Sequence, residues 1–232
     1  MNSNVFLTPA ISAPVELRTA FLRRVAAWTV GGLCITSLAS IFSAIFLVPL
    51  VIQGGTIAIL AVVYGSFIIS QTVARKMVYG QSKAAGFVLG TSLQGLALGF
   101  ILAFVAFGSG NVASGVLLIG QCVLLTVFSA MAMLMYVTMA PRDFSLLGTG
   151  LSMLFLPMLV LMGLSLVFPI GGTMGLIISG VFVLVSAGSL LYKLNFVIHR
   201  FDTSQAMEGG YELSLSLVVL LWNLLSLFSR RR

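Results

Sequence analysis

Hydrophobic positions along this chain are gathered into seven long runs that are separated by short polar breaks. The runs are residues 25–48, 55–74, 84–107, 114–139, 146–168, 173–192 and 211–229. Each run has about the length, roughly 20 residues, that an α-helix needs to cross the hydrocarbon core of a bilayer. Prolines at 49, 141 and 169 lie in the breaks, where they are typical helix-stop signals. The pattern predicts an all-α polytopic membrane protein with seven transmembrane helices.

Composition supports a lipid environment and excludes a soluble domain. The chain has 232 residues, of which 59% are hydrophobic and 7% charged, and its mean hydropathy is +1.16. A soluble domain has about 25% charged residues. The formal net charge is +7, but the basic residues do not form a stripe interleaved with aromatic side chains, as nucleic-acid binding requires. We expect a lipid bilayer as partner and no nucleic acid.

The basic residues instead predict the orientation in the membrane. The Lys and Arg residues before the last run all fall in the N-terminal tail or in the second, fourth and sixth loops: Arg18, Arg23, Arg24, Arg75, Lys76, Lys83, Arg142, Lys193 and Arg200. Positive loop charges mark the cytoplasmic side, so the N-terminus is predicted to be cytoplasmic. We divide the chain into a cytoplasmic tail (1–24), a transmembrane bundle (25–229) and a basic C-terminal tail (230–232).

The last run leaves two topologies open. A full crossing would place Arg230, Arg231 and Arg232 outside, against the charge bias, whereas a re-entrant segment would return them to the cytoplasmic side. No Gly or Pro interrupts residues 213–228, so the full crossing is preferred.

The third run carries glycines in two pairs, Gly86/Gly90 and Gly95/Gly99. At 100° per residue the two pairs lie on nearly opposite faces of a helix. Small residues allow helices to approach closely in membranes. The spacing therefore predicts two close helix contacts, one near each membrane surface.

Candidate chemistry is sparse, and the sequence predicts neither an enzyme nor a cofactor or metal site. The only histidine, His199, falls in the predicted sixth loop, and Cys34 and Cys122 lie inside apolar runs, where small buried residues are expected. No zinc-ligand spacing, phosphate-binding loop or nucleophile motif is present.

Polar groups inside the runs are neutral. They include Gln94, Gln121 and Asn223, which serve either as interhelical hydrogen-bonding groups or as a sparse polar pathway. The acids, including Asp202, Glu208 and Glu212, are predicted to lie on the cytoplasmic side, with Glu212 at the start of the last run and no ionisable residue near the middle of a run.

Three segments of the chain resemble the Bax inhibitor-1 family. Residues 21–36 (FLRRVAAWTVGGLCIT) are similar to its first helix, 136–148 (YVTMAPRDFSLLG) to its fourth loop and 215–225 (LSLVVLLWNLL) to its last helix. The resemblance implies a seven-helix bundle in which the other six helices surround the last. Some members are pH-sensitive calcium leak channels, and bacterial relatives include a modulator of the membrane protease FtsH, the branch that this chain looks closer to.

Departures from the family direct the functional expectation. The two aspartates of the calcium-leak members fall on Lys193 and Leu220 here. We therefore expect a regulatory protein of a bacterial inner membrane that contacts an FtsH-like protease or another membrane protein. The alternative is a calcium leak channel with an aspartate-free pore. The candidate pore or partner contacts are Asn223, Gln94, Gln121, Asp143, Arg142, Asp202 and Lys193.

Overall fold

The computed structural model describes residues 10–108, 111–139 and 172–229, and all the regular structure in these ranges is helical. Six of its helices are long and apolar enough to cross a membrane: 15–52, 55–78, 83–107, 112–137, 172–200 and 206–229. They correspond to six of the seven predicted runs. The fifth run, 146–168, lies outside the described residues, so the seventh span stays a prediction.

The first two spans are each interrupted by a π-helical turn. The elements are η1 (Ala10–Ser12), α1 (Val15–Phe42), η2 (Ser43–Leu47), α2 (Val48–Ile52), α3 (Gly55–Ile69), η3 (Ser70–Ala74), α4 (Arg75–Val78), α5 (Lys83–Gly108), α6 (Val112–Met139), α8 (Gly172–Arg200) and α9 (Ala206–Ser229). The predicted tail 1–24 therefore includes the first turns of α1, which follows Pro14.

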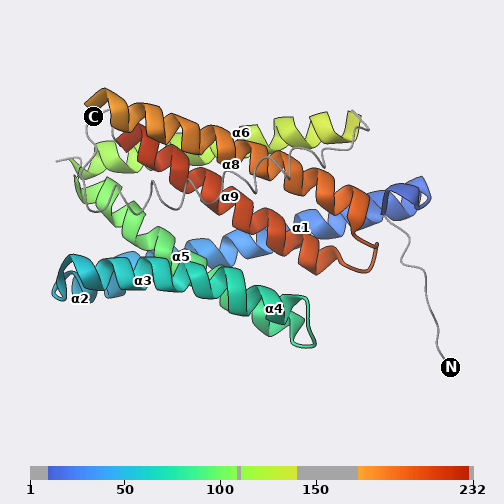
Figure 1. Ribbon diagram of the computed structural model, residues 1–232, viewed down its shortest axis with the longest axis horizontal. Coiled ribbons are helices and arrows are strands. Elements are labelled where there is room, and N and C mark those ends of the chain that lie inside the picture. The colour runs from blue at the N-terminus through green and yellow to red at the C-terminus, as the bar shows by residue number, and fades with distance from the viewer. Residues whose placement is uncertain (1–9, 109–110, 140–171, 230–232) are drawn as a thin grey trace.

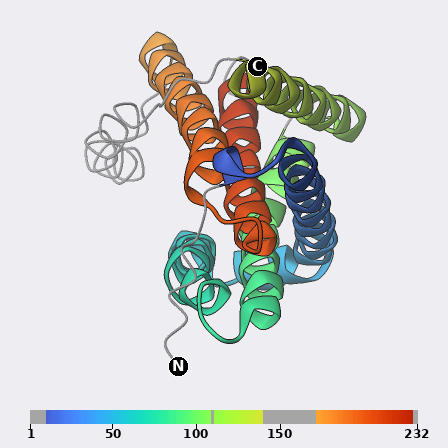
Figure 2. The same cartoon turned by 90° about the vertical axis from the view of Figure 1, so that its right-hand side faces the viewer.

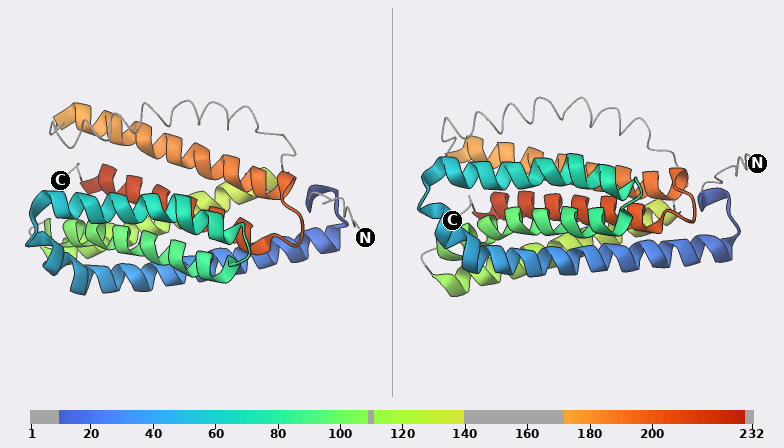
Figure 3. Two further views of the ribbon diagram at one scale, coloured as in Figure 1. Left: turned by 60° about the horizontal axis from the view of Figure 1, so that its bottom comes forward. Right: turned by 90° about the horizontal axis from the view of Figure 1, so that it is seen from below.

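One end of the bundle carries the basic residues that the structure describes. At this end lie the first residues of α1, α5 and α9 and the last residues of α4 and α8 (Figures 1 and 3). The opposite end holds α2 and the last residues of α9 (Figures 1 and 3). We call the first of these the basic end. The helix ends that meet here are those that the loop charges of the sequence place on one side of the membrane. That this side is cytoplasmic stays a prediction.

The last helix occupies the middle of the bundle, as predicted. Helix α9 packs against α1, α4, α5, α6 and α8, and the end-on view shows the others around it (Figure 2). Half of its most apolar stretch is buried, against 17–22% for the spans formed by α1, α3, α6 and α8. Helix α5 shares this central position, with 56% of its stretch buried.

The glycines of α5 make the two predicted contacts. A Cβ on Gly86 would lie 2.6 Å from the Met77 Cβ, at the α4 side, and a Cβ on Gly99 would lie 2.5 Å from the Ser40 carbonyl oxygen of α1. Gly95 likewise faces α1, and Gly90 faces Tyr211 of α9. The pair Gly86/Gly90 thus contacts α4 and α9 on one face of α5, and the pair Gly95/Gly99 contacts α1 on the opposite face, as their spacing predicts.

The ends of α8 and α9 differ from the expectation. Helix α8 continues to Arg200, so Lys193 and His199 lie in the helix, and α9 begins at Ala206, so Glu208 is helical as well, whereas Glu212 lies within the predicted run. The helices continue through these polar residues, where Lys193 and Glu208 pair with charged side chains of other helices and His199 contacts the Asn195 carbonyl oxygen. Cys34 also differs, because it is exposed on α1, while Cys122 is buried as expected.

Candidate functional site

Two carboxylates are buried on one face of α9 near the basic end. Glu208 and Glu212 are one helical turn apart, which places them on the same side of the helix, and their side chains are only 2% and 3% exposed. Glu212 lies about 9 Å along the helix from its first residue. Burying a charge is costly unless the charge is paired and hydrogen-bonded, so the partners of these acids define the site.

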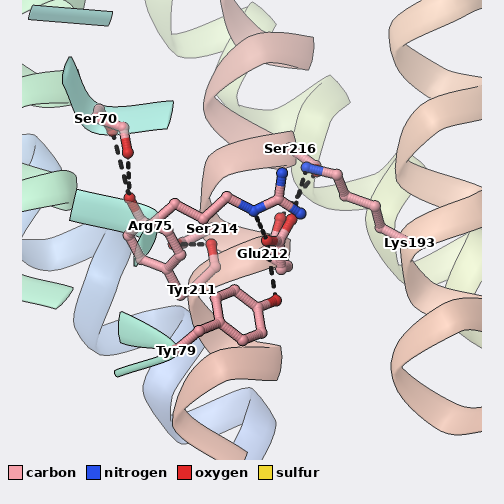
Figure 4. A network of polar contacts seen from close by, with 8 residues as sticks. All are labelled: Ser70, Arg75, Tyr79, Lys193, Tyr211, Glu212, Ser214 and Ser216. Carbon is pink, nitrogen blue, oxygen red and sulfur yellow. Dashed lines mark hydrogen bonds and ion pairs between the residues drawn. The ribbon is translucent and has the colours of Figure 1, made fainter. Parts of the chain in front are cut away.

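Glu212 is held by groups from two other helices and one loop. Its Oε1 lies 2.7 Å from Nε of Arg75, the first residue of α4, and accepts a hydrogen bond of 3.1 Å from the Tyr79 hydroxyl. Its Oε2 lies 3.0 Å from Nζ of Lys193 on α8. Figure 4 shows these groups converging on the carboxylate from both sides of α9. One carboxylate therefore joins α4, α8 and α9.

Glu208 has a single partner. Nζ of Lys83, at the start of α5, lies 2.5 Å from Oε1 of Glu208. The other oxygen, Oε2, is buried and has no hydrogen-bond partner among the described residues. Lys83 is half-exposed, so this pair ties the buried face of α9 to the surface of the basic end.

Local structure aims Arg75 at α9. The π-helical turn η3 comes immediately before Arg75, and Ser70 at its start is anchored twice. Its hydroxyl donates to the Gly90 carbonyl at 2.9 Å, and its own carbonyl accepts from the Tyr211 hydroxyl at 2.9 Å. Arg75 then lies over the Tyr79 ring, 5.9 Å from its centroid. The turn and its anchors thus present both residues, one helical turn apart, to Glu212.

The cluster carries three basic and two acidic side chains, so it is nearly balanced when all are ionised. Burial, and then the negative charge of Glu212, raise the pKa of Tyr79. Its hydroxyl therefore keeps its proton and remains a donor to the carboxylate. Arg75 and Lys193 stabilise the ionised form of Glu212, and loss of its charge would remove the attraction for both.

Of the predicted site residues that the structure describes, only Lys193 lies in this cluster. Asn223 is half-buried on α9, about 16 Å further along the helix than Glu212. Gln94 is buried in α5 and Gln121 is exposed on α6. Gln94 is thus enclosed by the bundle and Gln121 is on its surface, so these two amides do not share a buried site.

Asp202 lies in the turn between α8 and α9 and is hydrogen-bonded within that turn. The Ser204 hydroxyl donates to its carboxylate at 2.7 Å, and this hydrogen bond chiefly lowers the pKa of Asp202. His199 is on the last turn of α8, where its Nδ1 lies 3.0 Å from the Asn195 carbonyl oxygen. Arg142 and Asp143 lie outside the described residues.

Sequence reasoning left Glu208 and Glu212 out of the candidate site residues, because hydropathy places Glu208 in the sixth loop and Glu212 at the first residues of the last run. The spacing of Glu208, Glu212 and Ser216, four residues apart, is a helical signal that continues into the last run. Gly209 and Gly210 between the acids look like a break, yet both are helical, and Gly210 packs against Trp28 of α1. Among the described residues no group of three or more His, Cys, Asp or Glu side chains could hold a metal ion.

Comparison with known proteins gives two matches over nearly the whole chain. A family model described as "Inhibitor of apoptosis-promoting Bax1" matches residues 18–232. The "Golgi anti-apoptotic protein" of vaccinia virus, from strains Lister and LC16m0, is 30% identical over 224 residues, which cover 93% of this chain and 87% of the viral protein. The family match spans all the helices that carry the carboxylate cluster.

Proposed function

This chain belongs to the Bax inhibitor-1 family, and we propose that it is a cation leak protein that is closed at the basic end by the pairing of Glu212 with Arg75 and Lys193. The observation that carries the proposal is a buried, ion-paired carboxylate within a membrane span. Ionisable residues inside spans are rare and costly, and they mark ion or proton pathways by default.

Loss of the negative charge on Glu212 is the step that would open the pathway. Arg75 and Lys193 approach Glu212 from α4 and α8, so the neutral acid would no longer hold these helices against α9. The freed carboxylate face, with Glu208 one turn away, would then meet cations that enter from the basic end. The sequence favours a contact regulator because the calcium-leak aspartates are absent and no ionisable residue lies near the middle of a run. We rank the leak protein first because Glu212 is a buried, ion-paired carboxylate inside the span of α9.

Flux through liposomes tests this proposal. Purified protein is reconstituted with a calcium-sensitive dye inside, and the rate is measured before and after a drop in external pH. We expect acid to raise the rate in the wild type, and Glu212→Gln to leak severalfold faster at neutral pH with little further response to acid. Glu16→Gln, an exposed acid at the start of α1, is the matched control. Absence of flux in every variant would remove the leak function.

A second candidate is regulation by contact with another membrane protein. It is favoured by the name of the viral relatives, which describes them as anti-apoptotic. For this chain the FtsH-like protease stays the predicted partner, and the expectation that it is not an enzyme belongs to the same proposal. Affinity capture with an FtsH-like protease, together with slower or faster turnover of protease substrates on deletion, would support it, and no change in either would contradict it.

The membrane in which the protein resides is part of this proposal. The protein is integral to a lipid bilayer, since its apolar helices and its family agree on this point. We place it in a bacterial inner membrane because of its resemblance to the bacterial branch, whereas the word Golgi in the name of the viral relatives favours an organelle membrane. Cell fractionation with an antibody to the native protein distinguishes the two.

A further inference from the structure

An amide without a partner lies deep in the bundle. Gln94 is on α5, about 16 Å along the helix from Lys83, and is 1% exposed. Neither its Nε2 nor its Oε1 has a hydrogen-bond partner among the described residues. An amide left unpaired in an apolar interior costs a few kcal/mol. Such a group needs an explanation, and an ordered water molecule is the usual one.

The packing of α3 on α5 places a hydroxyl opposite Gln94. The two helices are antiparallel, and Ser70 contacts Gly90 while Val63 packs in one apolar cluster with Ala97. Moving four residues back along the α3 span from Ser70 therefore corresponds to moving four residues forward along α5 from Gly90. This register sets Ser66 against Gln94.

Ser66 has hydrogen-bonding capacity to spare. Its side chain is 7% exposed, and its hydroxyl donates to the Val63 carbonyl at 3.1 Å. A hydroxyl oxygen that donates one bond can still accept two. Ser66 can therefore accept a hydrogen bond from a water molecule that Gln94 also binds.

Helix α9 supplies a third polar group one turn nearer the basic end. The Tyr211 hydroxyl packs against Gly90 and donates to the Ser70 carbonyl. Gln94 follows Gly90 by four residues, and side chains of a helix lean toward its N-terminus. The Gln94 amide therefore leans toward the Tyr211 hydroxyl, whose oxygen can still accept a hydrogen bond.

We propose that Gln94, Ser66 and Tyr211 bind an internal water molecule where α3, α5 and α9 meet. Water suits this place because it needs two to four polar partners and because the groups are neutral donors and acceptors. No carboxylate or basic side chain belongs to the set, so a dehydrated ion would be poorly stabilised. Phe87, whose ring centroid is 6.0 Å from that of Tyr211, lies seven residues nearer the basic end on α5 than Gln94.

Hydroxyl-radical footprinting of the full chain in nanodiscs tests the site. X-rays generate radicals from ordered water in place, so they modify adjacent side chains that bulk solvent does not reach. Tyr211 and Leu215 are both 0% exposed. We expect mass spectrometry to find modification of Tyr211 or Leu215 in the wild type and a severalfold loss of it in Gln94→Leu. Gln121→Leu, which removes an exposed amide from α6, should leave the modification unchanged.

Two further variants keep the test decisive if Gln94→Leu fails to fold. Gln94→Met keeps the length of the side chain without its polar atoms, and Ser66→Ala removes the opposing hydroxyl, and both should lower the modification of Tyr211. An unmodified Tyr211 and Leu215 in the wild type, or equal modification in the folded variants, would overturn the proposal. The readout is hydration and not flux, so its failure is separate from a failure of the leak function.

Discussion

At the scale of the residue, the structure concentrates its strongest polar interactions on Glu212. The carboxylate accepts from a guanidinium, an ammonium and a phenol, and charge-assisted hydrogen bonds of this kind are stronger than neutral ones. Removing one partner of a buried ion pair leaves the others uncompensated. Glu212 is therefore the residue on which the stability of the basic end most depends.

Glu212→Gln should lower the stability of the protein. We expect a loss of about 1–3 kcal/mol, the size of a hydrogen bond to a charged group with its desolvation. The value lies below that of a fully buried pair because the Arg75 side chain is 47% exposed and solvent screens it. Thermal unfolding in detergent measures the effect, with Glu16→Gln as the exposed control. A melting temperature equal to that of the wild type would show that the ion pairs do not hold the helices.

Lys193 illustrates what could be predicted at this scale. The sequence marks it as a departure from the calcium-leak pattern and as a residue near the mouth of the bundle, and the structure places it against Glu212. The acid that it meets could not be predicted, because the two lie on different helices and nothing local indicates their pairing.

At the scale of the element, α5 is the helix that sets the spacing of the bundle. Its glycines bring α1 to one face and α4 and α9 to the other. Side-chain hydroxyls reinforce the first contact, since Thr36 donates to the Thr91 carbonyl at 3.1 Å and Ser43 donates to the Leu96 carbonyl at 2.8 Å. The α1–α5 contact thus combines close backbone approach with interhelical hydrogen bonds.

Gly99→Ala should loosen this contact. The added Cβ would lie 2.5 Å from the Ser40 carbonyl oxygen, which is backbone and cannot move aside cheaply. Overpacking of this kind costs about 1–3 kcal/mol, and thermal unfolding should show it. Gly120→Ala on α6 is the matched control because a Cβ there meets nothing within 4 Å. Equal melting temperatures for the two variants would contradict the close contact.

Helix ends were the least predictable part of the elements. The apolar runs end at 192 and begin again at 211, but α8 continues to Arg200 and α9 begins at Ala206. Hydropathy identifies a stretch that is compatible with lipid. It cannot identify polar turns that stay helical because neighbouring helices satisfy their side chains.

At the scale of the whole molecule, the direction of the last helix decides the topology. Helix α9 is continuous over 24 residues, or about 36 Å, and its two ends lie at opposite ends of the bundle (Figure 1). Its length and course favour the full crossing over a re-entrant segment. The basic end and the end of α9 should therefore face opposite sides of the membrane.

Cysteine labelling checks this topology in a background without Cys34 and Cys122. Ser204→Cys lies in the turn between α8 and α9, and Ser229→Cys lies at the end of α9, and both positions are exposed. With a membrane-impermeant maleimide on intact spheroplasts, we expect Ser229→Cys to react and Ser204→Cys to react only after lysis. Labelling of both before lysis would contradict the crossing, and the reverse pattern would contradict the cytoplasmic basic end.

The sequence alone determines the membrane-spanning helices. It also determines which of their ends are basic and which two faces of α5 carry the glycine pairs. These features depend on hydropathy, charge and helical period, which are properties of neighbouring residues. The carboxylate cluster and the unpaired Gln94 were decided by the tertiary structure. Lys83 and Glu208 are 125 residues apart, and Tyr79 and Glu212 are 133 apart, so only the packing of helices turns acids that appear solvated into buried ion pairs.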